Sequence, residues 1–247
     1  MIRIFSDSTC DLSKELIERY DITILPLHIL LGEEEFLDGV DITPDEIYKW
    51  SDEHKTTPKT SAVSIEDVMK AAEPYLDQGD EIISFSISDD MSTSGNVMHM
   101  AAAELEAEDR FHVINSANLS TGIGLLVIEA AIMAKEGKAS EEIITKIEEH
   151  PKIVVENGAM NADKKYRGKI AAVIMAYVKD IEEDLKNARP DRVFITHSGS
   201  DPKVVQEVYD YLEGLHYFDE ICITRAGGVV SSHCGYGTLG VLYIANE

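Results

Sequence analysis

Two hydrophobic patterns alternate regularly along this chain. Short runs rich in Val, Ile and Phe, which are typical of buried strands, are separated by longer stretches in which apolar residues recur with helical spacing. This alternation is typical of an α/β fold in which helices cover largely parallel sheets. We predict strands at 2–7, 22–31, 81–88, 111–116, 192–199, 220–227 and 238–246, and helices at 11–20, 64–76, 95–108, 122–137, 140–150, 166–186 and 201–215.

The alternation is weakest between residues 150 and 165, where the sequence is polar, rich in turn-forming residues and without clear periodicity. Domains most often contain about 100 to 150 residues, so a chain of 247 residues has room for two compact ones. We therefore expect an N-terminal α/β domain over residues 1–150 and a C-terminal α/β domain over residues 151–247.

Charge limits the partners that this chain can have. It contains 46 Asp and Glu residues against 22 Lys and Arg residues, a formal net charge of −24. Such a charge repels nucleic acids and anionic membrane surfaces, so we exclude both as partners. The sequence has no apolar run long enough to cross a bilayer and no signal-peptide pattern at its start. We expect no stable membrane insertion and a cytoplasmic location.

Hydroxyl side chains gather in the loops that follow the predicted strands, where open α/β sheets bind their ligands. Thr60 and Ser61 stand in one such loop, and Ser94 and Gly95 end another, STSG. A helix that begins at Ser94-Gly95 would offer free backbone amides and the positive end of its dipole. These loops are suited to a carboxylate or a phosphate.

The alternative for each loop is a helix cap, a role in which Ser, Thr and Asp are strongly preferred. Ser64 with Asp67 three residues later resembles a capping box, and Asp11 or Ser94 are candidates to cap the helix that follows each of them. For any one loop taken alone, capping is the commoner use.

His233 lies in the glycine-rich stretch 225–240. If this stretch binds no ligand, we expect it to form tight turns between strands. The histidine could act as a general base, bind an acidic ligand or be a hydrogen-bonded turn residue. The eight histidines are scattered and the three cysteines form no CxxC pair, so we expect neither a metal nor a cofactor.

Arg167 belongs to a basic cluster, with Lys164, Lys165 and Lys169, in an otherwise acidic chain. The cluster precedes a predicted helix, although helix N-termini favour acidic residues. An anion or an acidic partner surface would explain it, and a solvated helix start is the alternative.

Six segments, spread in order over nearly the whole chain, carry a family resemblance: DSTCDL (7–12), ILPLHILLGEEEFLDGVDIT (24–43), PKTSAVS (58–64), SISDDMSTSGN (86–96), VINS (113–116) and GGVVSSHCGYG (227–237). Together they resemble the DegV family, bacterial proteins that bind a long-chain fatty acid. The resemblance implies that the acyl chain is buried and that Thr60, Ser61 and Ser94, with Gly95 beside it, hold the carboxylate.

In members of that family that serve a fatty-acid kinase, the protein presents the carboxylate for phosphorylation. Arg167 and His233 match the basic residue and the late histidine near this exit. The resemblance therefore implies a non-enzymatic acyl carrier whose only small molecule is the fatty acid and whose partner is a fatty-acid kinase.

The chain departs from the family pattern in three places. Asn96 follows the SG pair where threonine is usual, and Tyr236 replaces a proline in the late glycine turn. The leucine-rich helix and the GGR turn that open the family's second domain are not recognisable between residues 139 and 164. The resemblance thus predicts a second domain that lacks a segment.

Two other functions compete with fatty-acid binding. A degenerate, ligand-free scaffold or partner-binding module would use Thr60, Ser61 and Ser94 only as caps. A serine hydrolase would pair one serine with His233, but the sequence has neither a GxSxG elbow nor a readable triad.

Overall fold

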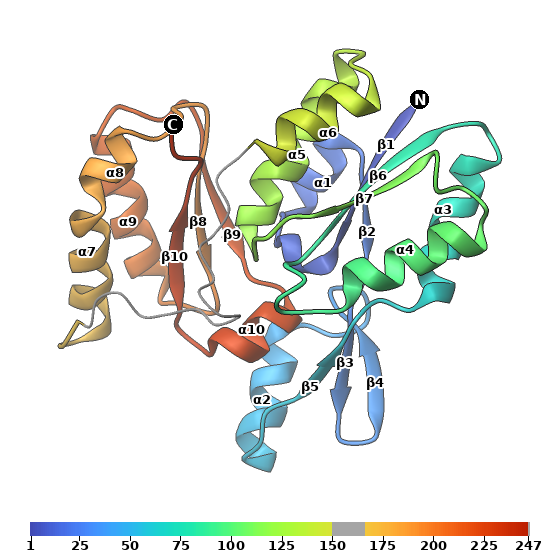
Figure 1. Ribbon diagram of the computed structural model, residues 1–247. Coiled ribbons are helices and arrows are strands. Elements are labelled where there is room, and N and C mark those ends of the chain that lie inside the picture. Colours follow the sequence, from blue (N-terminus) through green and yellow to red (C-terminus); the bar gives the residue numbers. More distant parts are fainter. Residues whose placement is uncertain (150–165, 247) are drawn as a thin grey trace.

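The computed structural model of the protein describes residues 1–149 and 166–246 (Figure 1). Its first sheet is entirely parallel and has the strand order β2-β1-β6-β7. The strands are β1 (Ile2–Asp7), β2 (Ile22–Leu25), β6 (Glu81–Ser86) and β7 (Phe111–Asn115). Ile4 stands in register with Ile22 on one side and Ile83 on the other, so that apolar residues line up across the sheet. The predicted α/β fold with mainly parallel strands is confirmed.

Helices cover both faces of this first sheet (Figure 1). One face packs against α1 (Lys14–Tyr20), α5 (Thr121–Lys135) and α6 (Ser140–Glu148), and the other against α3 (Ile65–Leu76) and α4 (Ser94–Glu104). Burial follows the alternation of the strands, because Ile83 and Phe85 enter the core on the side of α5 while Phe5 and Ile82 enter the core on the side of α3 and α4. Residues 2–7 and 81–86 are therefore apolar on both sides.

A second sheet has the order β10-β8-β9, in which β8 and β9 are parallel and β10 is antiparallel to β8. Its strands are β8 (Val193–His197), β9 (Ile221–Arg225) and β10 (Leu239–Leu242), and its helices are α7 (Ile170–Asp180), α8 (Glu182–Lys186) and α9 (Pro202–Gly214). The prediction of one helix over residues 166–186 is wrong, because the chain leaves helical geometry at Ile181 and starts again as α8.

A third, antiparallel sheet of order β4-β3-β5 was not expected. Its strands are β3 (His28–Leu31), β4 (Glu34–Leu37) and β5 (Lys59–Ser61), and α2 (Pro44–His54) connects the last two. The prediction of a single strand over residues 22–31 is wrong, because Pro26 has no amide hydrogen to continue the ladder and the chain changes sheet there.

The first two sheets share a hydrophobic core on the side of α5. Phe194 of β8 and Ile244 after β10 are buried in the same cluster as the residues of β1 and α5. The hydroxyl groups of Thr121 and Thr196 lie 2.6 Å apart across this junction. The expected domain division at residues 150 and 151 stays a prediction, because residues 150–165 lie outside the described residues, together with Lys164 and Lys165.

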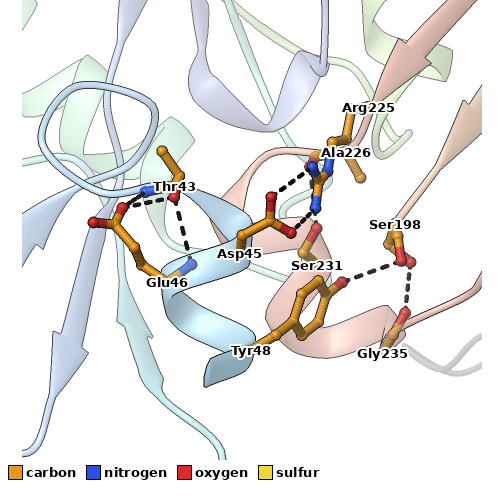
Figure 2. A network of polar contacts seen from close by, with 9 residues as sticks. All are labelled: Thr43, Asp45, Glu46, Tyr48, Ser198, Arg225, Ala226, Ser231 and Gly235. Carbon is orange, nitrogen blue, oxygen red and sulfur yellow. Dashed lines mark hydrogen bonds and ion pairs between the residues drawn. The ribbon is translucent and has the colours of Figure 1, made fainter. Parts of the chain in front are cut away.

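The start of α2 contacts the second sheet through a polar network (Figure 2). Asp45 forms an ion pair with Arg225 at the end of β9, and one of its oxygens accepts a hydrogen bond at 3.0 Å. Ser198, after β8, donates its hydroxyl to the carbonyl oxygen of Gly235. Tyr48 reaches the Ser198 carbonyl at a long 3.5 Å. The helix between β4 and β5 is thus fixed to the end of the second sheet.

Candidate functional site

A pocket with a volume of about 820 Å³ lies between β5, the loops after β6 and β7, and the helix α10 (Gly228–Cys234). Ligand pockets commonly measure about 300 to 1,000 Å³. The lining combines apolar, hydroxyl and charged side chains: Leu27, Thr60, Ser61, Ala62, Ile87, Asp89, Asp90, Met91, Ser92, Thr93, Leu119, Val229, Val230, His233 and Cys234.

The pocket brings His233 together with Thr60 and Ser61, although His233 follows Thr60 by 173 residues along the chain. The Thr60 hydroxyl and His233 Nε2 lie within hydrogen-bond distance, at 3.0 Å. Thr60 and Ser61 lie on β5, which pairs with β3 so that Thr60 is opposite Ile29. Three of the predicted binding residues therefore share one site.

Ser94 does not line the pocket. It is fully buried at the first position of α4, and its backbone amide donates to Ser92 Oγ at 3.2 Å. The two hydroxyl oxygens lie 2.9 Å apart. Ser92 and Thr93 line the pocket, and the buried Ser94 contacts Ser92 through its hydroxyl. The STSG sequence offers three adjacent hydroxyls, and only the structure distinguishes the two that line the pocket from the buried Ser94.

Gly95 also lies below the lining, and close packing explains why it is glycine. A Cβ atom at this position would lie 2.6 Å from Asp89 Oδ1 and 3.0 Å from Ser86 Oγ. Ser86 is fully buried, and its hydroxyl has no hydrogen-bond partner within the described part of the chain. The glycine therefore lets the Asp89 carboxylate approach the first turn of α4.

The capping alternative holds for one of the loops. Ser64 caps α3, because its hydroxyl accepts a hydrogen bond from the Asp67 amide at 3.1 Å. Capping by Asp11 is wrong, since Ser13 caps α1. Capping by Ser94 is wrong as well, since this residue lies inside α4, which has no side-chain cap.

The glycine-rich stretch, in which we expected tight turns, contains the helix α10. It supplies Val229, Val230 and His233 to the pocket. Two buried carboxylates hold its start: the Gly227 amide donates to Asp11 Oδ1 and the Gly228 amide donates to Asp38 Oδ1, each at 2.7 Å. The sequence concealed this helix because its first turn consists of poor helix formers.

Burial is the largest cause of the pKa shifts of three carboxylates, those of Asp7, Asp11 and Asp38. It raises the pKa of Asp11 to about 8, although the Ser120 hydroxyl and the Gly227 amide donate to this side chain and oppose the shift. Burial also raises the pKa of Asp7 to about 6, against hydrogen bonds from Thr9 and Ile87. It raises the pKa of Asp38 as well. These groups fix the loops beneath the pocket and do not line it.

Arg167 is not brought into the pocket. It is exposed just before α7 and is absent from the pocket lining. Across residues 1–149 and 166–246, no group of three or more His, Cys, Asp or Glu side chains could hold a metal ion. None of the helices in the described parts of the chain has the length and hydropathy that a membrane crossing requires.

The sequence model of one protein family, described as "Uncharacterised protein, DegV family", matches residues 1–154 and 150–246. A DegV domain-containing protein of Clostridium perfringens is 38% identical over 149 residues, which are 60% of this chain and 53% of the relative. A relative from Clostridium acetobutylicum is 37% identical over 146 residues, 59% of this chain and 52% of its own. The chain thus spans about half the length of these two relatives.

Another DegV domain-containing protein of Clostridium perfringens aligns along nearly its whole length. It is 26% identical over 287 aligned residues, which cover 98% of this chain and 97% of the relative. Because this alignment is longer than the 247-residue chain, part of that relative has no counterpart here.

Solved structures share the fold over almost the full chain. A DegV family protein from Thermus thermophilus, described by its fatty-acid binding, superposes with a TM-score of 0.87 at 22% identity, covering 99% of both chains. A stearic-acid-binding protein from Eubacterium ventriosum has a TM-score of 0.83 at 25% identity, covering 99% of this chain and 98% of its own. The fatty acid kinase B3 protein of Streptococcus pneumoniae, loaded with linoleic acid, has a TM-score of 0.82 at 17% identity and full coverage of both.

Proposed function

The chain belongs to the DegV family, and from this premise we propose that it binds a long-chain fatty acid, with the carboxylate on Ser and Thr hydroxyls and the acyl chain buried. The observation that carries the proposal is the pocket of about 820 Å³, in which hydroxyl groups stand next to apolar side chains. The fatty acids held by the Eubacterium ventriosum and Streptococcus pneumoniae proteins support the same class of ligand.

The head group is assigned to Thr60, Ser61 and Ser92. Their hydroxyls line the pocket, and His233 is positioned through its hydrogen bond with Thr60. Ser94 takes the role of a positioning residue, because its hydroxyl contacts Ser92 and not the pocket.

The tail is assigned to the apolar part of the lining, which includes Leu27, Ile87, Leu119, Val229 and Val230. Burying about 14 methylene groups at about 0.8 kcal/mol each contributes about 11 kcal/mol. Each hydrogen bond to a charged head contributes only about 1.5 to 3 kcal/mol. The tail therefore supplies most of the affinity, and the hydroxyls fix its orientation.

The proposal includes no catalytic step. His233 bonds to Thr60 and not to a serine. In the part of the chain that the structure describes, no carboxylate bonds to its other ring nitrogen, as a hydrolytic triad would require. Turnover of ester substrates that disappears in both Thr60→Val and His233→Ala would contradict this part of the proposal.

A fatty-acid kinase is the proposed protein partner. The kinase B3 protein of Streptococcus pneumoniae shares the fold, and exposed Arg167 would contact the kinase and not the head group. If no bacterial fatty-acid kinase phosphorylates the fatty acid bound to this protein, the proposed partner is wrong. The proposal of fatty-acid binding would not be affected by this result. A cytoplasmic location, as expected from the sequence, is also proposed.

The experiment that tests ligand binding is solvent extraction of natively purified protein followed by mass spectrometry. We expect an acid of about 14 to 18 carbons, the tail length used above. Protein that is empty when purified and that also takes up no added acid would overturn the proposal in favour of a ligand-free scaffold.

Variants of the pocket residues test whether the fatty acid binds in this pocket. Thr60→Val and Ser92→Ala should each weaken palmitic acid binding about ten-fold, the effect of losing one hydrogen bond to a charged head. Thr57→Val is the matched control, because Thr57 is exposed just before β5 and does not line the pocket.

A further inference from the structure

The charges around the pocket do not favour the anion that it is proposed to hold. Asp89 and Asp90 both belong to the lining, and His233 is the only described lining side chain that can become a cation. Among residues 1–149 and 166–246, no Lys or Arg lines the pocket, and the chain as a whole carries a formal charge of −24. An ionised head group would therefore meet like charges on entering the site.

Asp89 occupies a particular place within this lining. Its Oδ1 atom lies so close to the first turn of α4 that a Cβ atom on Gly95 would approach it to 2.6 Å. The helix has eleven residues and no side-chain cap of its own. The positive end of its dipole, which attracts anions, is next to the carboxylate that the protein itself provides.

The loop that carries Asp89 is fixed on both sides. The Asp89 amide donates to Asn115 Oδ1 at 3.3 Å. The amides of Met91 and Ser92 both donate to the Ser88 carbonyl oxygen, at 2.9 and 3.1 Å. Asp89 is thus held in the same short turn that presents the Ser92 hydroxyl to the pocket.

We propose that Asp89 is a specificity-determining residue that competes with the ligand's carboxylate for the start of α4, so that the pocket discriminates against ionised head groups. This inference rests on the proposed function, because it concerns the head group of the same ligand. Two unit charges about 4 Å apart repel each other by about 1 kcal/mol even in water, and more strongly in a partly buried site. A lipid with the same chain length and a neutral head group does not experience this repulsion.

The test compares a charged with an uncharged ligand in equilibrium binding of radiolabelled palmitic acid and hexadecanol at neutral pH. The protein is first stripped of lipid. In Asp89→Asn we expect palmitic acid to bind about five-fold more tightly or better, the factor that corresponds to removing one nearby like charge. Hexadecanol affinity should stay within about two-fold, because the alcohol carries no charge.

Asp90→Asn is the matched control. Asp90 neighbours Asp89, lines the same pocket and is also exposed, but no contact places it beside Gly95. It should leave the ratio of the two affinities nearly unchanged. The melting temperature of each variant, measured without ligand, separates an effect on binding from an effect on folding.

Three results would overturn the inference. Wild-type protein that binds palmitic acid with no change in Asp89→Asn rejects it and leaves the proposed function standing. Equal tightening in Asp89→Asn and Asp90→Asn would show that the general negative charge, and not the position of Asp89, is responsible. If neither ligand binds to any variant, the proposed function fails and this inference fails with it.

Discussion

Two adjacent glycines decide how closely α10 can approach the rest of the molecule. Gly227 and Gly228 donate their amides to buried carboxylates. A side chain would fit tightly at Gly227, whereas at Gly228 it would overlap its neighbours. A Cβ atom on Gly228 would lie 2.6 Å from Ile47 Cδ1 and 2.7 Å from Ile29 Cδ1. Both isoleucines are fully buried, so neither can move freely.

We expect Gly228→Ala to lower the free energy of unfolding by about 1 to 3 kcal/mol, the usual cost of overpacking a core. Gly214→Ala is the control, because no atom would contact the added Cβ at this helical position. It should be neutral or stabilise the protein by up to about 1 kcal/mol. Urea denaturation of both variants measures the difference, and equal stabilities would contradict this packing argument.

Asp11 gives the stability of the protein an unusual pH dependence. Its pKa is about 8 in the folded protein, mainly because of burial, whereas an unfolded aspartate has a pKa of about 3.9. Between these values the folded state holds a proton that the unfolded state has lost. This contribution to stability is therefore fully present below about pH 4 and is lost as the pH rises to about 8.

Asp11→Asn removes this titration. We expect the free energy of unfolding of the variant, compared with that of the wild type, to increase steadily from about pH 5 to about pH 8. Asp7, with a pKa of about 6, should cause a smaller loss of stability with rising pH in both proteins. Denaturant titrations at several pH values measure it, and a constant difference between the two proteins would refute the assignment to Asp11.

Among the secondary-structure elements, β5 and α3 divide the hydroxyls of one short stretch between two tasks. Ser64 caps α3, whereas Ser61 lies on β5 and lines the pocket. The sequence distinguished them in part, because the capping-box spacing from Ser64 to Asp67 is visible without a structure. That Ser61 lines a pocket depends on the pairing of β5 with β3, which no local pattern indicates.

Alanine substitutions should separate the two tasks. Ser64→Ala should lower the free energy of unfolding by about 1 kcal/mol, the typical value of a lost cap, and leave palmitic acid affinity unchanged. Ser61→Ala should weaken palmitic acid binding with little change in stability. Thermal unfolding and equilibrium binding, measured on both variants, test this, and a shared effect on both quantities would argue against the division.

Elements with strong periodicity were the ones that the sequence predicted well. Long amphipathic helices such as α3 and α9 appear where expected, with differences of a few residues at their ends. The helix α2 was missed although Thr43, Pro44 and Glu46 form a capping box with proline in the first turn. Its sequence contains few apolar residues, so the hydrophobic pattern alone does not reveal it.

For the whole molecule, the shared core indicates that the described parts of the chain unfold together. Phe194 belongs to the second sheet but is fully buried in the cluster formed by β1 and α5. A side chain at such a junction connects the stability of both sheets, although the second sheet also has a core cluster of its own with α7 and α9.

We expect Phe194→Ala to lower the free energy of unfolding by about 3 to 5 kcal/mol, as for other large core residues. In the wild type, fluorescence of Trp50, the single tryptophan, reports on α2. Its urea transition should coincide with the transition of helical circular dichroism in both proteins. Separate transitions would show that α2 unfolds independently of most of the other helices and would contradict unfolding in one step.

Local patterns in the sequence were enough to predict the α/β class, most of the strands and helices, the family resemblance and the loops that carry the proposed binding residues. Hydrophobic periodicity and capping preferences are local properties, so they can be read without a fold. The pairing of Thr60 with His233, the outward position of Ser92 in place of Ser94, and the approach of Asp89 to Gly95 were decided only by the tertiary structure. Each of these depends on contacts between separate segments, or on which side of a turn faces a cavity, and the order of residues does not specify either.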